Sequence, residues 1–131
     1  MKNRSFYIVA SIFGALSGAF GAFGAHTLKE LITHDQLVIY EKGISYQFYH
    51  TIALFITAFL IERNDVKYFK WAGYCFIGGI IFFSGSLYLL SMNGMIGLNE
   101  KIIGPITPIG GLGFIMGWLF LAYGNFKLKI K

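Results

Sequence analysis

The chain has 131 residues, of which 56% are hydrophobic and 13% are charged, and its net charge is +5. Soluble globular domains usually carry about 25% charged residues, so this composition excludes an ordinary soluble domain. The pI of about 9.4 could suggest nucleic-acid binding. However, the basic residues lie at the ends of apolar stretches and form no basic stripe, so we exclude nucleic acid as a partner.

Four apolar stretches without Asp, Glu, Lys or Arg follow one another along the chain. A transmembrane helix needs about 20 mostly apolar residues to cross about 30 Å of hydrocarbon, and each stretch is long enough. We therefore predict an all-α, polytopic membrane protein, with one domain over residues 1–131 that forms a bundle of four transmembrane helices. After trimming at local turn signals, the predicted spans are approximately 5–25, 43–61, 71–92 and 108–126.

The first span, 5–25, follows two basic residues, Lys2 and Arg4. This order also fits a secretory signal peptide, but the apolar run is longer than the usual hydrophobic region of about 7–15 residues. We therefore expect the segment to be retained as a helix. Its small residues recur every three or four positions, as in helices that pack closely in membranes, and comprise Ala10, Gly14, Ser17, Gly18, Gly21, Ala22 and Ala25.

The second span has a helix start that lies before the membrane. Thr33, with Gln36 three positions later, matches a capping box. The helix is therefore predicted to begin near His34 and to continue unbroken through Ile61. Residues 27–32 are then expected to form a short interfacial turn after the first span.

Turn residues set the boundaries of the last two spans. The Asn-Gly dipeptide at 93–94 is a turn signal, so the third span is predicted to end near residues 91–92. Thr107 is predicted to be a helix N-cap, with Pro108 as the first helical residue. The segment 91–107 is expected to be a loop that rests on the membrane surface.

Basic residues indicate the orientation in the membrane, because cytoplasmic loops carry an excess of Lys and Arg. Four spans place both termini on one side, and that side also holds the second connection. We therefore predict that both termini are cytoplasmic and that the protein is a multi-pass protein of the cell membrane. The inner group contains Lys2, Arg4, Arg63, Lys67, Lys70, Lys127, Lys129 and Lys131, and the outer group contains Lys29, Lys42 and Lys101.

His50 is the candidate functional residue, since an ionisable side chain inside a span indicates function by default. At a rise of about 1.5 Å per residue, it lies about 16 Å from the inner end of its span, near the midplane. We favour a role as a polar contact between helices, because no carboxylate is available as a relay partner; a proton or ligand site is the other interpretation. The candidate polar cluster comprises Ser17, Gln47, His50, Ser84 and Ser86.

Two further candidates lie at the outer interface. His26, at the end of the first span, is interpreted as an interfacial anchor. The helix start at Thr107 offers free backbone N–H groups and is a candidate seat for a lipid phosphate or another anion. We predict no cofactor and no metal site, because His26 and His50 differ in depth and the lone Cys75 lies in an apolar run.

Several motifs along the chain resemble a known family of small bacterial membrane proteins. In order they are GAFGAH at 21–26, YQFYH at 46–50, FSGSLY at 83–88, TPIGG at 107–111 and GW at 117–118. The family is catalogued as domain of unknown function 423, is of the UPF0382 type and includes YwdK- and YgdD-like proteins. The resemblance covers nearly the whole chain, and it implies a four-span protein of the cell membrane with no assigned enzymatic activity.

Two hypotheses of function follow from the residues. The first is a non-catalytic bundle that binds membrane lipids or a membrane partner, which could be another protein or a second copy of the chain. The alternative is a small oligomeric transporter or proton-linked channel in which His50 and Gln47 line the path, since histidine titrates in the physiological range. We do not predict an enzyme, because a histidine among serines lacks the orienting carboxylate and oxyanion donors of nucleophilic catalysis.

Overall fold

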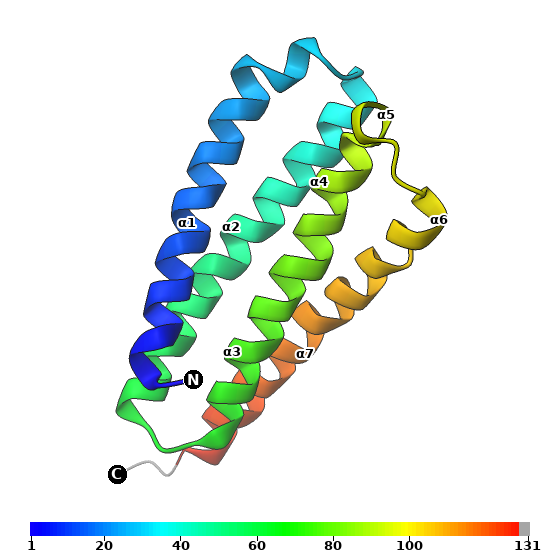
Figure 1. The fold of residues 1–131 in the computed structure, drawn as a ribbon. Helices are drawn as coiled ribbons and strands as arrows, with labels where there is room; N and C mark the ends of the chain where they lie inside the picture. The colour runs from blue at the N-terminus through cyan, green and yellow to red at the C-terminus, as the bar shows by residue number, and fades with distance from the viewer. Residues whose placement is uncertain (129–131) are drawn as a thin grey trace.

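Helices and their connections make up all the residues that the computed structural model describes, 1–128 (Figure 1). Four helical rods are long and apolar enough to cross a membrane, which confirms the predicted all-α, four-span architecture. Lys129 and Lys131 lie outside the described residues. The elements are α1 (Asn3–His26), the 3-10 turn η1 (Leu28–Glu30), α2 (His34–Arg63), α3 (Lys67–Gly79), the π-helical turn η2 (Ile80–Ser84), α4 (Gly85–Ser91), α5 (Asn93–Ile96), α6 (Glu100–Ile103) and α7 (Ile106–Lys127).

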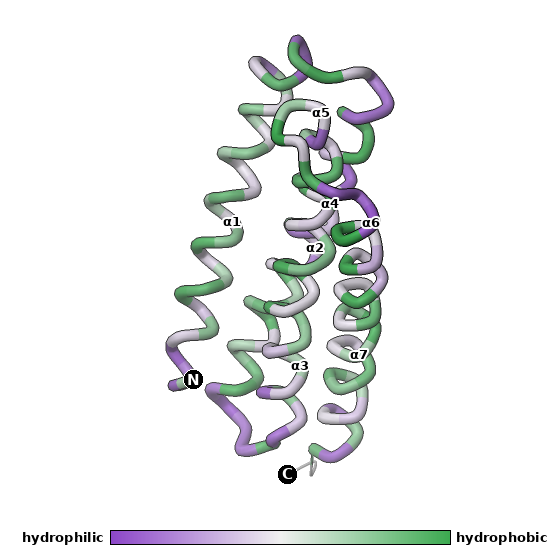
Figure 2. The backbone as a smooth tube through the Cα atoms, turned by 45° about the vertical axis from the view of Figure 1, so that its right-hand side comes forward, coloured by the Kyte–Doolittle hydropathy of each residue, from purple (hydrophilic) through white to green (hydrophobic). Residues whose placement is uncertain are grey.

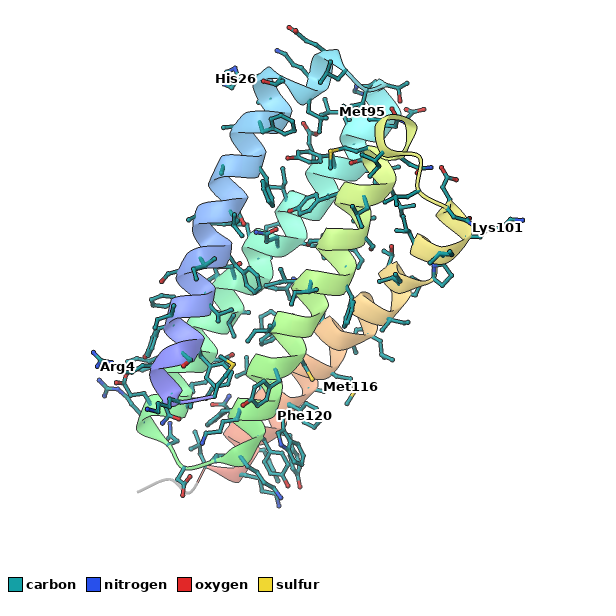
Figure 3. All side chains as sticks on the ribbon, in the orientation of Figure 1. Arg4, His26, Met95, Lys101, Met116 and Phe120 are labelled. Atoms are coloured by element: carbon teal, nitrogen blue, oxygen red, sulfur yellow. The ribbon has the colours of Figure 1, made fainter. Side chains whose placement is uncertain are left out.

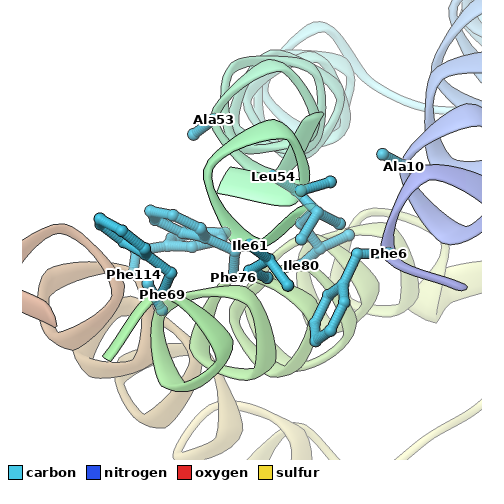
Figure 4. Packing of buried hydrophobic residues seen from close by; sticks show 11 residues of the cluster. Phe6, Ala10, Ala53, Leu54, Ile61, Phe69, Phe76, Ile80 and Phe114 are labelled. Atoms are coloured by element: carbon cyan, nitrogen blue, oxygen red, sulfur yellow. The ribbon is translucent and has the colours of Figure 1, made fainter. Parts of the chain in front are cut away.

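The four rods occupy unequal positions in the bundle. α2 packs against the continuous rod of α3, η2 and α4 in the centre, while α1 packs on α2 and α7 packs on α3 and η2. Figure 4 looks along the helices and places α1 and α7 on opposite flanks of the central pair. The most apolar windows of the two flanking spans are accordingly only 17% buried, against 44% and 39% for the central ones. The flanking helices therefore present most of their apolar surface to the surroundings.

Polar residues gather at the two ends of the bundle, and apolar residues fill the length between them (Figure 2). The N-terminus, the α2–α3 connection and the end of α7 lie together at one end, which we call the basic end because it carries Lys2, Arg4, Arg63, Lys67 and Lys70. η1, α5 and α6 lie at the opposite end. An even number of crossings thus brings both ends of the helical region to one side, and the cytoplasmic assignment of that side stays a prediction.

The predicted capping box starts α2. The Gln36 backbone N–H donates to Thr33 Oγ1 at 3.2 Å, and the Thr33 backbone N–H donates to Gln36 Oε1 at 2.9 Å. The helix begins at His34, as predicted, and continues to Arg63. Before it, η1 forms the expected short turn, and its Leu28 is fully buried. Local side-chain capping and one apolar anchor therefore fix the connection between α1 and α2.

Two short helices replace the loop that was expected between the last two spans. The third rod ends at Ser91, close to the predicted boundary. α5 follows and is terminated by Gly97, whose φ of +67° is a left-handed conformation that glycine adopts without strain. Asn99 then caps α6, because its side chain accepts a hydrogen bond from the Lys101 backbone N–H at 3.0 Å. Local capping thus gives helical turns to a segment that has no strong apolar periodicity.

The last rod begins earlier than its prolines suggested. α7 starts at Ile106 with Pro105 as its N-cap, so the prediction of Thr107 as the N-cap and Pro108 as the first helical residue is wrong. Thr107 and Pro108 both lie in the first turn. The first four N–H groups of a helix have no partner within it, so a proline in this turn sacrifices no hydrogen bond.

Aromatic rings packed on glycines hold the rods together. A Cβ added to Gly117 would lie 2.6 Å from the ring of Phe76, and one added to Gly73 would lie 2.6 Å from the ring of Phe6. Both rings are fully buried in the core (Figure 4). Close contact at small residues is the usual basis of helix association in membranes. The same ring-on-glycine contact recurs at Gly24, Gly43, Gly79 and Gly124, against Tyr40, Tyr88, Phe114 and Phe69 respectively.

Candidate functional site

Gln47 joins three helices through its side-chain amide. Its Nε2 donates to the backbone carbonyl of Phe13 on α1 at 2.9 Å, and its Oε1 accepts from the hydroxyl of Tyr88 on α4 at 2.6 Å. Ser17 Oγ donates to the same Phe13 carbonyl at 2.9 Å. The structure therefore brings Ser17 and Gln47 together around one carbonyl oxygen, and adds Tyr88 as a partner.

His50 faces a different side of α2, toward α7. Its Nε2 lies 3.3 Å from Trp118 Nε1 and its Nδ1 lies 2.8 Å from the Tyr46 carbonyl oxygen. An indole N–H can only donate, so Nε2 is the acceptor, and Nδ1 carries the proton that it donates to the carbonyl. The imidazole also stacks on the ring of Phe114, with centroids 3.5 Å apart and planes 8° from parallel. Both ring nitrogens are thus occupied in a neutral histidine.

Ser86 forms a third, separate contact. Its Oγ donates to the Phe83 carbonyl at 2.9 Å and lies 2.6 Å from Thr107 Oγ1 on α7. Because the single Ser86 proton is used toward Phe83, the Thr107 hydroxyl is the donor between the two. Thr107 is half-buried and links α4 to α7, so its side chain does not cap a free helix start.

Ser84 is fully buried in the π-helical turn η2, and its hydroxyl has no hydrogen-bond partner among the described residues. The predicted cluster is therefore divided. Ser17 and Gln47 lie between α1, α2 and α4, His50 lies between α2 and α7, Ser86 lies between α4 and α7, and Ser84 stands alone. The five side chains were predicted to meet because they lie at similar depths along their helices, but they face different neighbouring helices.

His26 lies exposed at the last position of α1, and Figure 3 shows its side chain outside the bundle at the end opposite the basic end. This position fits the interfacial location that was predicted, and its role as an anchor stays a prediction. Within residues 1–128, no three residues of the types His, Cys, Asp and Glu gather as they would around a metal ion.

A cleft of about 600 Å³ opens between α2 and α7 beside His50. Such a volume falls within the range of about 300–1,000 Å³ that is usual for small-molecule sites. Tyr46, His50 and Trp118 are the lining residues with polar side-chain atoms, and the others are apolar residues and one glycine. The cleft is lined by Tyr46, His50, Phe83, Pro108, Gly111, Leu112, Phe114, Ile115 and Trp118.

The residues that sequence reasoning missed are the partners rather than the histidine. Phe114 and Trp118 are four residues apart, so they lie on one face of α7, and that face holds Gly110 and Gly117 as well. This spacing is a signal for a helix contact, but it does not indicate which helix is contacted. The structure shows that this face contacts His50 on α2.

Comparison with known proteins identifies the family. The model of the family described as "Protein of unknown function (DUF423)" matches residues 20–111. The chain belongs to the DUF423 family. It is 40% identical over 124 residues to the UPF0382 membrane protein SAB0533 of Staphylococcus aureus, covering 95% of this chain and 97% of that protein.

Relatives of similar length occur in other bacteria. Identity is 37% to the UPF0382 membrane protein YwdK of Bacillus subtilis, over 95% of this chain and 98% of that protein. It is 33% to the inner membrane protein YgdD of Escherichia coli, over 100% of this chain and 96% of that protein. No solved structure matches the chain. These names and the four apolar rods establish a multi-pass membrane protein of a family whose function is unknown.

Proposed function

We propose that this DUF423 protein is a non-catalytic membrane protein that binds a membrane lipid in the cleft between α2 and α7. The observation that carries the proposal is the cleft itself, a volume of about 600 Å³ that is lined mostly by apolar rings and chains. Leu112 and Ile115 line it and remain 59% and 58% exposed. Since α7 flanks the bundle, these side chains would face the bilayer, and a lipid could enter from the side.

The hydrogen bonding of His50 supports binding over catalysis. Its nitrogens are engaged by a backbone carbonyl and by an indole N–H, whereas a histidine that activates a nucleophile bonds to a hydroxyl or thiol and is oriented by a third group. The hydroxyls of Ser17 and Ser86 donate to backbone carbonyls instead. The side chains of the predicted cluster therefore do not form a nucleophile–base pair.

The same hydrogen bonds count against the alternative of a proton-linked channel. A histidine that relays protons must take up a second proton on its free nitrogen. At His50 that nitrogen faces the N–H of Trp118, and two donors would then oppose each other. We therefore do not favour the transporter hypothesis.

The proposed location is the cell membrane, with the basic end in the cytoplasm. Arg63, Lys67 and Lys70 gather at the α2–α3 connection, and Lys2 and Arg4 lie at the same end. The excess of Lys and Arg in cytoplasmic loops supports this orientation.

A pair of matched glycine substitutions tests the proposed lipid site. Gly111 lines the cleft, and a Cβ there would meet the Phe83 ring at 3.7 Å, an ordinary contact, so Gly111→Leu fills the cleft without a backbone clash. No atom of the described residues lies within 4 Å of the Cβ position of Gly78 on α3, so Gly78→Leu is the same chemical change at another helix surface. We expect native mass spectrometry from lipid nanodiscs to detect lipid-bound protein for wild type and Gly78→Leu, and little for Gly111→Leu. Equal lipid retention by all three proteins would contradict the proposal.

A further inference from the structure

We infer that the basic end of the bundle carries a second lipid site, between α3 and α7, where two lysines bind the phosphate of an anionic phospholipid. The site goes beyond the proposed function, because it shares no residue with the α2–α7 cleft and selects a headgroup. We call it the lysine–ring surface, and it consists of Lys67, Tyr68 and Trp71 on α3 and Phe120, Tyr123 and Lys127 on α7.

Aromatic rings form a continuous surface across the two helices. Tyr68 and Tyr123 have ring centroids 4.7 Å apart, and the Trp71 centroid lies 5.3 Å from that of Tyr68. Trp71 also contacts Phe120 on α7, with centroids 5.3 Å apart. Trp71 and Tyr123 remain 44% and 43% exposed, so a ligand can reach these rings from outside the bundle.

Each helix adds one lysine to these rings. Lys67 Nζ lies 5.2 Å from the ring centroid of Trp71 and 5.4 Å from that of Tyr68. Lys127 Nζ lies 5.3 Å from the ring centroid of Tyr123. Distances below about 6 Å are typical of cation–π contacts, so both ammonium groups lie at the same ring surface.

The charge of the two lysines is available to an anion. Neither α3 nor α7 contains Asp or Glu, and within residues 1–128 neither ammonium is paired with a carboxylate oxygen. An ammonium carries three N–H donors, and contact with a ring face leaves donors for an anion. The lysine–ring surface is therefore complementary to a negatively charged group.

The order of charge and rings along the helices matches a phospholipid. Lys67 is the first residue of α3 and Lys127 the last of α7, so both lie where headgroups meet the basic end. Phe120 precedes Lys127 by seven residues (Figure 3), and the rings thus extend about 10 Å toward the middle of the span. A phospholipid offers a phosphate and an apolar chain over this length, whereas free phosphate or an acidic peptide would leave the deeper rings uncovered. Basic sites between membrane helices bind anionic headgroups in this way.

Brominated lipids test the site, with Trp71 as a reporter inside it. Trp118→Phe removes the only other tryptophan of the chain. This protein is reconstituted in vesicles of equimolar phosphatidylglycerol and phosphatidylcholine with the same acyl chains, and one lipid or the other is brominated on its chains. We expect stronger quenching of Trp71 when phosphatidylglycerol is brominated. The contribution of two lysines near an anionic headgroup corresponds to a preference of about tenfold to thirtyfold.

Charge-matched variants separate the site from a general attraction to the basic end. Lys67→Gln with Lys127→Gln should make the two brominated lipids quench equally. Lys2→Gln with Arg4→Gln removes the same charge from the same end and should keep the preference. Lys67→Arg with Lys127→Arg should keep it as well, and far-UV circular dichroism checks that the Gln variants retain their helices. An equal loss of preference in both Gln pairs would overturn the inference.

The remaining outcomes are equally decisive. Equal quenching by both lipids before any lysine is changed would overturn the inference and leave an ordinary interfacial belt of rings and lysines. Little quenching by either lipid would mean that protein covers the rings, as between two copies of the chain, and would overturn it too. A preference that phosphate buffer abolishes, but sodium chloride of the same ionic strength does not, would assign the seat to free phosphate.

Gly111→Leu distinguishes this site from the α2–α7 cleft. The substitution fills the cleft, and it should leave the preference at Trp71 unchanged because Gly111 is not part of the lysine–ring surface. If Gly111→Leu abolishes the preference and the Lys67→Gln, Lys127→Gln pair does not, the anionic lipid occupies the cleft and the second site is disproved. Loss of the cleft proposal alone would leave the lysine-dependent preference intact.

Discussion

Single polar residues in the spans mostly bond within their own helix. The hydroxyls of Ser17, Thr51 and Thr57 each donate to the carbonyl four residues earlier. Such bonds satisfy a polar group in an apolar environment without joining helices. Gln47 and His50 differ, because their side chains reach other rods. Interhelical hydrogen bonds in membranes contribute about 0.6 kcal/mol on average, so these two specify packing more than they stabilise it.

Substitutions of Ser84 and Ser86 test how much a hydrogen bond between helices contributes to stability. Ser86→Ala removes the acceptor of Thr107 and is expected to lower the free energy of unfolding by about 0.5–1.5 kcal/mol. Ser84 has no hydrogen-bond partner among residues 1–128, so Ser84→Ala removes an unsatisfied buried hydroxyl. The substitution should leave the stability unchanged or raise it by up to about 1 kcal/mol. Unfolding of both variants in mixed detergent micelles measures the difference. Destabilisation by Ser84→Ala would mean that an ordered water or a moved side chain satisfies this hydroxyl.

At the scale of elements, the close approach of α7 to the third rod depends on its glycines. A Cβ at Gly110 would collide with the backbone of Phe82 and Phe83 in η2, and one at Gly113 would lie 3.3 Å from the Cys75 carbonyl oxygen. Backbone atoms cannot rotate aside as a flexible side chain can. The π-helical turn and the glycines of α7 therefore form one contact, which positions α7 beside α2 and creates the cleft.

A second glycine pair tests this contact. Gly110→Ala should destabilise the fold by about 1–3 kcal/mol, the usual cost of overpacking, because the backbone of η2 must move. In the part of the chain that the structure describes, no atom lies within 4 Å of the Cβ position of Gly18 on α1. Gly18→Ala should therefore be neutral or stabilising by up to about 1 kcal/mol, since alanine favours helix over glycine. Thermal unfolding followed by circular dichroism distinguishes the two, and similar melting curves would disprove the contact between α7 and η2.

In the molecule as a whole, the arrangement of four rods leaves α1 and α7 more exposed than α2 and α3. Polar ends and an apolar middle fit a single orientation across a bilayer (Figure 2). The lateral cleft arises because α7 packs on α3 and η2 while only side chains bridge it to α2.

Cysteine labelling checks the orientation of this molecule. In a Cys75→Ser background, Lys2→Cys and Lys127→Cys should be protected from a membrane-impermeant maleimide in intact spheroplasts, and Lys101→Cys should react. All three positions are exposed, so the membrane alone decides access. Permeabilised cells, in which every variant should react, are the control. Labelling of Lys2→Cys but not Lys101→Cys in intact cells would reverse the proposed orientation.

Patterns in the sequence predict the number of rods, most of their ends and their location in a membrane. Long uncharged runs indicate membrane helices because burying a charge in hydrocarbon is costly. The capping box at Thr33 and the end at Ser91 follow from interactions within a few residues. The family motifs are also short local patterns, and they indicated the family that the comparisons show. The start of α7 was misplaced by two residues because its prolines are tolerated throughout the first turn.

Which side chains meet depends on the packing of the rods in three dimensions. Counting residues gives the depth of His50, Gln47 and the serines along their helices, but it does not give the direction in which each helix faces. That rotation is set by contacts between rods, such as the ring of Phe76 on Gly117. Gln47 and His50 share one helix yet contact α1 and α7 on opposite flanks. The cleft and the partners of His50 are therefore properties of packing, which no local pattern in the sequence contains.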